Sequence, residues 1–209
     1  MEPEKTVLFA TDSPSMRNLA SELTAELHAL PALDAPEDFE PWREEAMTRP
    51  AADRLIVSLW HEEPQGGALV DLDESSWEQR FERPYLLWNL ALGAAAGRCR
   101  DGGAIVALVQ TPAALDSPGW TPEASIGDGV VALTRSLAAS EGPRGVRANT
   151  VTTPLRFVEG EVIAPSPPLA TFPGRLEVEV AGAVRLLLSA DAAGLTGRVL
   201  SADCGRAFV

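Results

Sequence analysis

Short apolar runs, each bounded by polar residues or glycine, recur along the chain and predict buried strands. Val, Ile, Leu and Ala dominate these runs, and each run is shorter than an ordinary helix. This combination is typical of parallel strands that are covered on both faces. The runs lie at residues 6–10, 55–59, 104–109 and 198–202.

Amphipathic segments between these runs predict helices. Ser13 supplies an N-cap and Pro14 a first-turn proline. Four leucines then recur at helical spacing and form one apolar stripe: Leu19, Leu23, Leu27 and Leu30. We therefore expect a first helix that carries the whole stripe, with His28 partly buried beside it. Further helices are expected over about 37–48, 75–97, 124–141 and 176–189.

The alternation of strands and helices predicts an α/β fold with right-handed crossovers and a doubly wound parallel sheet. No internal repeat or linker divides the chain, so we expect residues 1–209 to form a single domain. The least regular stretch, 154–173, contains five prolines. We interpret it as a surface loop rather than a domain boundary.

Composition narrows the class of function. The chain has 209 residues, of which 45% are hydrophobic, enough for one sizeable core. Its formal net charge of -13 would repel phosphate, so we expect neither nucleic acid nor an anionic membrane as a partner. Cys99 and Cys204 are too few for a disulfide framework, and the hydrophobic pattern predicts neither a signal peptide nor a membrane span. We expect a cytoplasmic protein.

Residues 128–149 resemble the core helix and the following strand of a short-chain dehydrogenase/reductase. Further segments resemble the same family in the same order: 52–57, 72–81, 102–106 and 186–203. The resemblance covers most of the chain from about residue 53 onward, and it implies a Rossmann-like doubly wound sheet. We expect this sheet to be shortened in its N-terminal half, because the strands at 6–10 and 55–59 leave no room for the family's usual intervening strand.

The resemblance also implies a catalytic site that this chain has not retained. The family uses a serine, a tyrosine that acts as general acid or base, a lysine four residues later and an asparagine in the long helix. Those positions fall here on Gln110, Glu123, Gly127 and Pro84, in that order. The only tyrosine, Tyr85, and the only lysine, Lys5, cannot form a Tyr-x-x-x-Lys pair. We therefore expect no catalytic residues for hydride transfer.

The turn after the first strand is also unlike a dinucleotide site. Dinucleotide folds place a glycine-rich turn there, so that the backbone approaches the pyrophosphate at a helix N-terminus. This chain has no glycine before Gly66, and its turn consists of Thr11, Asp12, Ser13 and Pro14. Side chains would crowd the phosphates there and Asp12 would add like charge, so we expect no cofactor. Asp34 lies about where the acidic ribose ligand would, but without the glycines we interpret it as a loop aspartate.

Polar residues near the carboxyl ends of the strands leave a different chemistry open. Glu123 with His61 or Asp128 would be an acid/base pair for catalysis without a cofactor, since an apolar cleft raises the pKa of a carboxyl. The spacing of His61, the two glutamates after it and Glu123 matches no zinc pattern, so we expect a polar rim and no metal site. Trp60 and Trp120 flank the same edge. We interpret these side chains as filling a vacant cleft rather than as binding an apolar ligand.

Two predicted helical stretches, 85–97 and 130–137, are small and apolar around much of their circumference. A surface helix of a monomer needs a polar face, so burial by another subunit explains them better. In the resembled family these helices pack against their counterparts as a four-helix bundle. The chain keeps the helices with which the family assembles but lacks the residues with which it catalyses. This combination favours a non-catalytic subunit in a hetero-oligomer with an active short-chain dehydrogenase paralogue. The alternatives are a homo-oligomeric isomerase, dehydratase or cyclase, and a ligand-binding regulatory protein.

Overall fold

Six parallel strands form the centre of this computed structural model, in the order β2-β1-β3-β4-β5-β8. The structure describes residues 4–60, 67–111, 119–158, 161–163, 169 and 175–206. All neighbouring strands pair in parallel, which confirms the predicted doubly wound α/β sheet. The strands are β1 (Thr6–Ala10), β2 (Glu26–Ala29), β3 (Ala52–Ser58), β4 (Cys99–Gln110), β5 (Arg147–Thr153) and β8 (Val199–Ser201).

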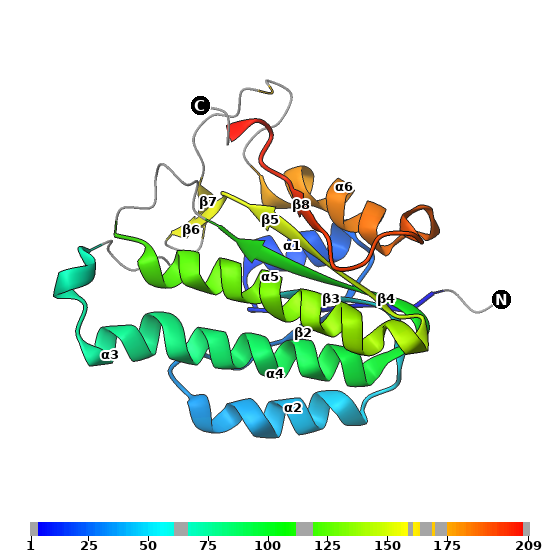
Figure 1. The fold of residues 1–209 in the computed structure, drawn as a ribbon, viewed down its shortest axis with the longest axis horizontal. Helices are drawn as coiled ribbons and strands as arrows, with labels where there is room; N and C mark the ends of the chain where they lie inside the picture. Colours follow the sequence, from blue (N-terminus) through cyan, green and yellow to red (C-terminus); the bar gives the residue numbers. More distant parts are fainter. Residues whose placement is uncertain are drawn as a thin grey trace.

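Helices cover both faces of this sheet. Figure 1 shows α5, α4 and α2 side by side across one face, while α1 and α6 lie together on the other. A short helix and a π-helical segment lead into α4, so one nearly continuous helical stretch covers the predicted range 75–97. The bounds are α1 (Pro14–Glu22), α2 (Phe39–Thr48), α3 (Glu74–Trp77), the π-helical segment (Glu78–Glu82), α4 (Arg83–Arg98), α5 (Thr121–Glu141) and α6 (Leu176–Leu188). Short 3-10 turns lie at Pro36–Asp38, Leu69–Asp71, Gly142–Arg144 and Ala190–Ala192.

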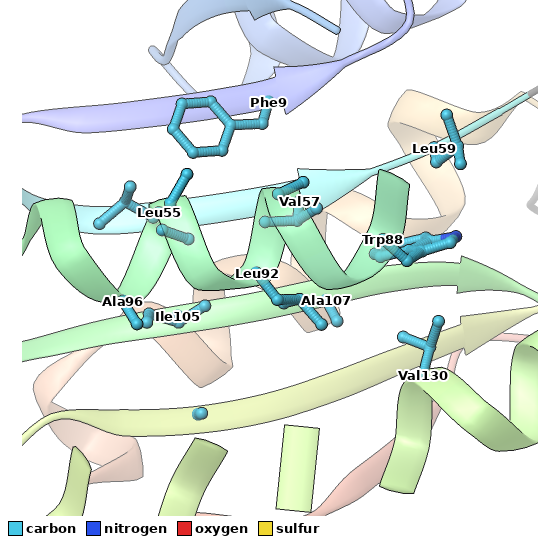
Figure 2. Packing of buried hydrophobic residues seen from close by; sticks show 14 of the residues in the cluster. Phe9, Leu55, Val57, Leu59, Trp88, Leu92, Ala96, Ile105, Ala107 and Val130 are labelled. Carbon is cyan, nitrogen blue, oxygen red and sulfur yellow. The ribbon is translucent and has the colours of Figure 1, made fainter. Parts of the chain in front are cut away.

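The central strands contribute to two cores, one on each face of the sheet. Leu55 and Val57 of β3 belong to the core beneath α4, whereas Ile56 belongs to the core beneath α1 and α6. Figure 2 shows Trp88 and Leu92 of α4 lying over the strands on the first of these faces. Because both faces are covered, successive strand residues are all buried, and this explains the continuous apolar runs in the sequence.

The N-terminal segment differs from the prediction. The first helix ends at Glu22, Thr24 has a left-handed φ of 51°, and the last three leucines of the stripe lie beyond the helix. His28 lies on the strand β2, where it pairs with Phe9, and not on a helix. Without β2, one side of β1 would keep unpaired backbone groups, so strand pairing overrides the helical spacing of the leucines. Along the chain, β2 lies between β1 and β3, so the expectation of no room for an intervening strand was wrong, although the sheet is shortened as predicted.

Part of the proline-rich stretch forms a small antiparallel sheet of its own. Its strands are β6 (Arg156–Val158) and β7 (Glu161–Ile163), so the stretch is not a plain loop. Apart from these strands and residues 154, 155 and 169, the range 154–173 lies outside the described residues. Within the described part of the chain, none of the helices is both long enough and apolar enough to cross a membrane.

Candidate functional site

The candidate site lies at the carboxyl edge of the sheet, where β1, β3 and β4 end at Ala10, Ser58 and Gln110. In open parallel sheets this edge is where ligands bind. The chain brings all four predicted site positions towards this edge. Gln110 ends β4, Pro84 lies in the first turn of α4, and Glu123 and Gly127 lie one turn apart on α5.

Glu123 is held by an arginine that the sequence analysis did not identify. Arg80 donates to both carboxylate oxygens, with Nε···Oε1 at 2.9 Å and Nη2···Oε2 at 2.8 Å. The two side chains are only 12% and 11% exposed, and the guanidinium also donates to the Gly119 carbonyl at 3.0 Å and lies 6.0 Å from the Trp120 ring centroid. A fork-to-fork pair in a largely buried place directs both carboxylate oxygens at Arg80.

The neighbouring positions leave little room for larger side chains. A Cβ at Gly127 would lie 2.8 Å from Cγ2 of Thr111, so a side chain there requires a shift of Thr111. Pro84 is buried within the first turn of α4 and lacks the backbone donor of other residues. Asp128, the second acid/base candidate on α5, is exposed.

The turn after β1 is organised by its own side chains. Ser13 caps α1 by accepting from the Met16 N–H at 3.3 Å. Arg17 donates to both oxygens of Asp12, at 2.7 and 2.9 Å, and this pair holds the pKa of Asp12 below its usual value. The helix N-terminus therefore already has a polar partner, and Asp12 stays negatively charged beside it. Pro14, the first residue of α1, offers no backbone N–H.

Trp60 fills the edge between β1, β3 and β4. The indole is fully buried, and its Nε1 donates at 2.6 Å to Ser58 Oγ, which in turn donates to the Leu108 carbonyl at 3.1 Å. The Thr11 hydroxyl donates to the Trp60 carbonyl at 2.6 Å and fixes the turn against it. Trp60 is therefore part of the core at this edge, whereas Trp120 is only half-buried at the rim.

Only one of the remaining candidates lies among the described residues. His61, Glu62 and Glu63 lie outside the described residues. Asp34 is exposed in a turn after β2. Among the residues that the structure describes, no three His, Cys, Asp or Glu side chains are grouped so that they would hold a metal ion.

The strand order, the flanking helices and the element sequence define a Rossmann-like α/β protein. The profile of the family described as Enoyl-(Acyl carrier protein) reductase matches residues 53–207. The chain belongs to the short-chain dehydrogenase/reductase family. None of the curated proteins compared with the chain matches it.

Solved structures of this family share the fold at low sequence identity. A small-chain dehydrogenase superposes with a TM-score of 0.73 at 19% identity, covering 98% of this chain and 100% of that one. A short-chain dehydrogenase/reductase from Serratia marcescens gives 0.72 at 20% identity, with 97% of each chain covered. A blue fluorescent protein from a metagenomic library, solved in complex with NADPH, gives 0.70 at 22% identity and covers 96% of this chain and 87% of that one.

Proposed function

We propose that this chain is a non-catalytic subunit that assembles with an active NAD(P)-dependent short-chain dehydrogenase. The observation that carries the proposal is the fully buried Trp60 indole at the carboxyl edge, the edge at which dinucleotide folds bind their ligand. Glu123, which the resemblance puts at the family's tyrosine position, is paired with Arg80 at the same edge. Neither arrangement offers a proton donor for a substrate carbonyl or a place for a pyrophosphate.

The outer face of α4 supports assembly. Leu86 is 49% exposed, Leu90 is half-buried, and Gly93 and Gly97 are exposed on the same side of the helix. No atom lies within 4 Å of where a Cβ on Gly93 would be, whereas a Cβ on Gly97 would lie 3.0 Å from Cε of Met47, so the face is open at Gly93 and bordered by α2 at Gly97. An exposed stripe of leucine and glycine on one helix offers a close, apolar approach to a second helix.

α5 contributes less apolar surface than its sequence predicted. Val130 is buried and Leu133 is half-buried, whereas Arg135 and Ser136 are exposed. The apolar residues of this stretch therefore mostly pack inside the subunit. The proposed interface is centred on α4, with the polar outer face of α5 at its rim.

Co-expression tests the assembly. The chain, carrying an affinity tag, is produced together with a paralogue from the same genome that retains the glycine-rich turn and the Tyr-x-x-x-Lys pair. We expect the two to co-purify as a defined complex by light scattering after gel filtration. Leu86→Glu should disrupt the complex, since a charge would be buried in an apolar contact. The matched control is Leu186→Glu on α6, where the leucine is 47% exposed on the other face of the sheet.

The proposal would be contradicted if no complex forms, or if Leu86→Glu and Leu186→Glu reduce the amount of complex equally. Calorimetric titration with NADH and NADPH tests its premise separately. We expect no binding to this chain alone, and saturable binding at micromolar concentration would overturn the premise.

The acid/base alternative rests on Glu123, a carboxylate 11% exposed at the carboxyl edge. Because Arg80 donates one hydrogen bond to each of its oxygens, a substrate proton would have to reach one of the remaining lone pairs of the carboxylate. That alternative predicts that Glu123→Gln abolishes any turnover found while the fold is unchanged.

A further inference from the structure

A hollow of about 310 Å³ lies at the amino end of the sheet, opposite the carboxyl edge that holds the candidate site. Charged side chains from the strands form one part of its wall, and Leu188, Ala190 and Ala193 at the end of α6 form an apolar part. Its volume lies at the lower end of the range of small-molecule sites. The hollow is therefore large enough for a small organic ligand.

Two arginines flank a single alanine in this hollow. Arg54 of β3 and Arg147 of β5 both pair with Ala104 of the strand between them, so the three residues lie in one row across the sheet. Ala104 belongs to the core beneath α1 and α6, and residues of one row share a face, so both arginines lie on that face (Figure 1). Strand spacing places their Cα atoms roughly 10 Å apart, a distance that two long side chains span readily.

The end of α6 holds Arg147 in place. Its Nη1 donates to the Leu187 carbonyl at 2.8 Å and its Nη2 to the Ser189 carbonyl at 3.0 Å. Carbonyl groups carry only partial charges, and no carboxylate among the described residues pairs with this guanidinium. Arg147 is partly exposed, and its Nε has no acceptor among the same residues, so this N–H is available to a ligand.

The charges around the hollow leave one positive charge uncompensated. The other charged side chains of the wall each have a partner of opposite charge: Arg54 has Glu4, Asp53 has Arg100, and Asp101 has Arg144. Burial, and then the charge of Arg54, hold the pKa of Arg147 below its usual value, so the two guanidinium groups repel each other. An anion between them would relieve this repulsion and balance the charge of Arg147.

Glu4 shows that an anionic oxygen fits beside Arg54. This glutamate is 61% exposed and precedes β1, in a part of the chain without regular structure. An exposed ion pair contributes little to stability, so its displacement costs little. A ligand that replaces Glu4 would keep Arg54 as a partner and gain Arg147 as a second one.

We propose that this hollow binds the phosphate group of a small phosphate monoester. The terminal oxygens of a phosphate form a tetrahedron and accept from two guanidinium groups on different sides, whereas a planar carboxylate suits a single fork. The ester group would lie against the apolar wall at the end of α6. The net charge of -13 acts over the whole molecule, but salt screens it beyond about 8–10 Å, so the two adjacent arginines dominate for a small ligand. This site does not depend on assembly with another subunit.

Phenyl phosphate is a suitable probe, because its phosphate is largely dianionic near pH ~7.5 and its ring matches the apolar wall. Calorimetric titration at physiological salt should show one site per chain, and the side-chain ¹⁵Nε resonances of Arg54 and Arg147 should shift on saturation. Benzoate carries the same ring on a planar monoanion, and we expect it to bind at least about tenfold more weakly. Equal binding of benzoate, or no saturable binding of phenyl phosphate up to roughly 20 mM, would overturn the proposal.

Two exposed ion pairs of similar setting provide matched variants. Arg54 and Glu4 are 32% and 61% exposed and line the hollow, whereas Arg43 and Glu40 are 39% and 60% exposed and lie on α2. We expect Arg54→Gln to weaken phenyl phosphate binding by about tenfold, and Glu4→Gln to strengthen it by about threefold because a competing anion is removed. Arg43→Gln and Glu40→Gln should leave it unchanged. Weaker binding with Glu4→Gln, or equal effects of Arg54→Gln and Arg43→Gln, would contradict the site.

Discussion

At the scale of single residues, the Arg80–Glu123 pair ties the π-helical segment to α5. Glu123→Gln would leave the largely buried Arg80 without its counter-charge. We expect a loss of about 2 kcal/mol in the free energy of unfolding, measured by urea denaturation. The control is Glu78→Gln, which removes the partner of Arg83 in a pair whose side chains are 26% and 48% exposed. That change should cost less than about 0.5 kcal/mol.

The same experiment separates structure from catalysis. If Glu123→Gln is as stable as the unchanged chain but abolishes a measured turnover, Glu123 is an acid or base and not a structural anchor. The pair joins residues that are 43 positions apart, in the π-helical segment and in α5. No local sequence pattern announces such a contact, which explains why Arg80 was missed.

His28 provides a prediction about pH. Its burial, and then the charges of Arg49 and Arg98, lower its pKa below the ordinary value. The unfolded chain therefore binds a proton near pH ~6.5 that the folded chain does not bind until lower pH, so stability falls as pH drops below that value. Urea denaturation between about pH 7.5 and 5.5 should show this loss, and His28→Phe should reduce the dependence. Identical slopes for both proteins would assign the pH dependence to other groups.

At the scale of elements, two glycines on adjacent helices predict opposite effects. A Cβ at Gly129 of α5 would lie 2.5 Å from Cε2 of Tyr85, so this glycine lets the α4 ring pack against α5. Gly129→Ala should lower the free energy of unfolding by about 1–2 kcal/mol through overpacking. Gly93→Ala on α4 meets no atom within 4 Å and should raise it by about 0.5–1 kcal/mol through helix propensity. Thermal and urea unfolding of both variants measure the difference, and changes of the same sign would contradict the packing described.

The elements also show where sequence patterns succeed and fail. The central strands follow the predicted runs closely because they are buried on both faces of the sheet. The helices α2, α5 and α6 follow them closely because each buries one clear apolar stripe. The segment after Glu22 does not, because its leucines suit a helix equally well and only pairing with β1 selects the strand. At the candidate site, the sequence alone predicts which residues stand at the family's positions, whereas the burial of Trp60 depends on how β1, β3 and β4 meet.

At the scale of the whole molecule, the charge of -13 bears on what the chain assembles with. Two copies brought together along α4 would each carry that charge, so their mutual repulsion opposes self-association at low ionic strength. Salt shortens the range of this repulsion to about 8–10 Å at physiological strength, and leaves the apolar contact at Leu86 intact. We therefore expect any homo-oligomer of this chain to form more readily as salt increases, as measured by light scattering after gel filtration.

The leucine variants make this prediction specific to the surface. Leu86→Glu should remove the salt-promoted association because it places a charge in the contact, whereas Leu186→Glu on α6 should leave it unchanged. Self-association that is strongest at low salt would mean that ion pairs, and not the apolar stripe of α4, hold the copies together. A partner subunit of lower negative charge would meet less repulsion along the same face. For this reason the charge of the molecule, together with the open stripe on α4, favours a hetero-oligomer over a homo-oligomer.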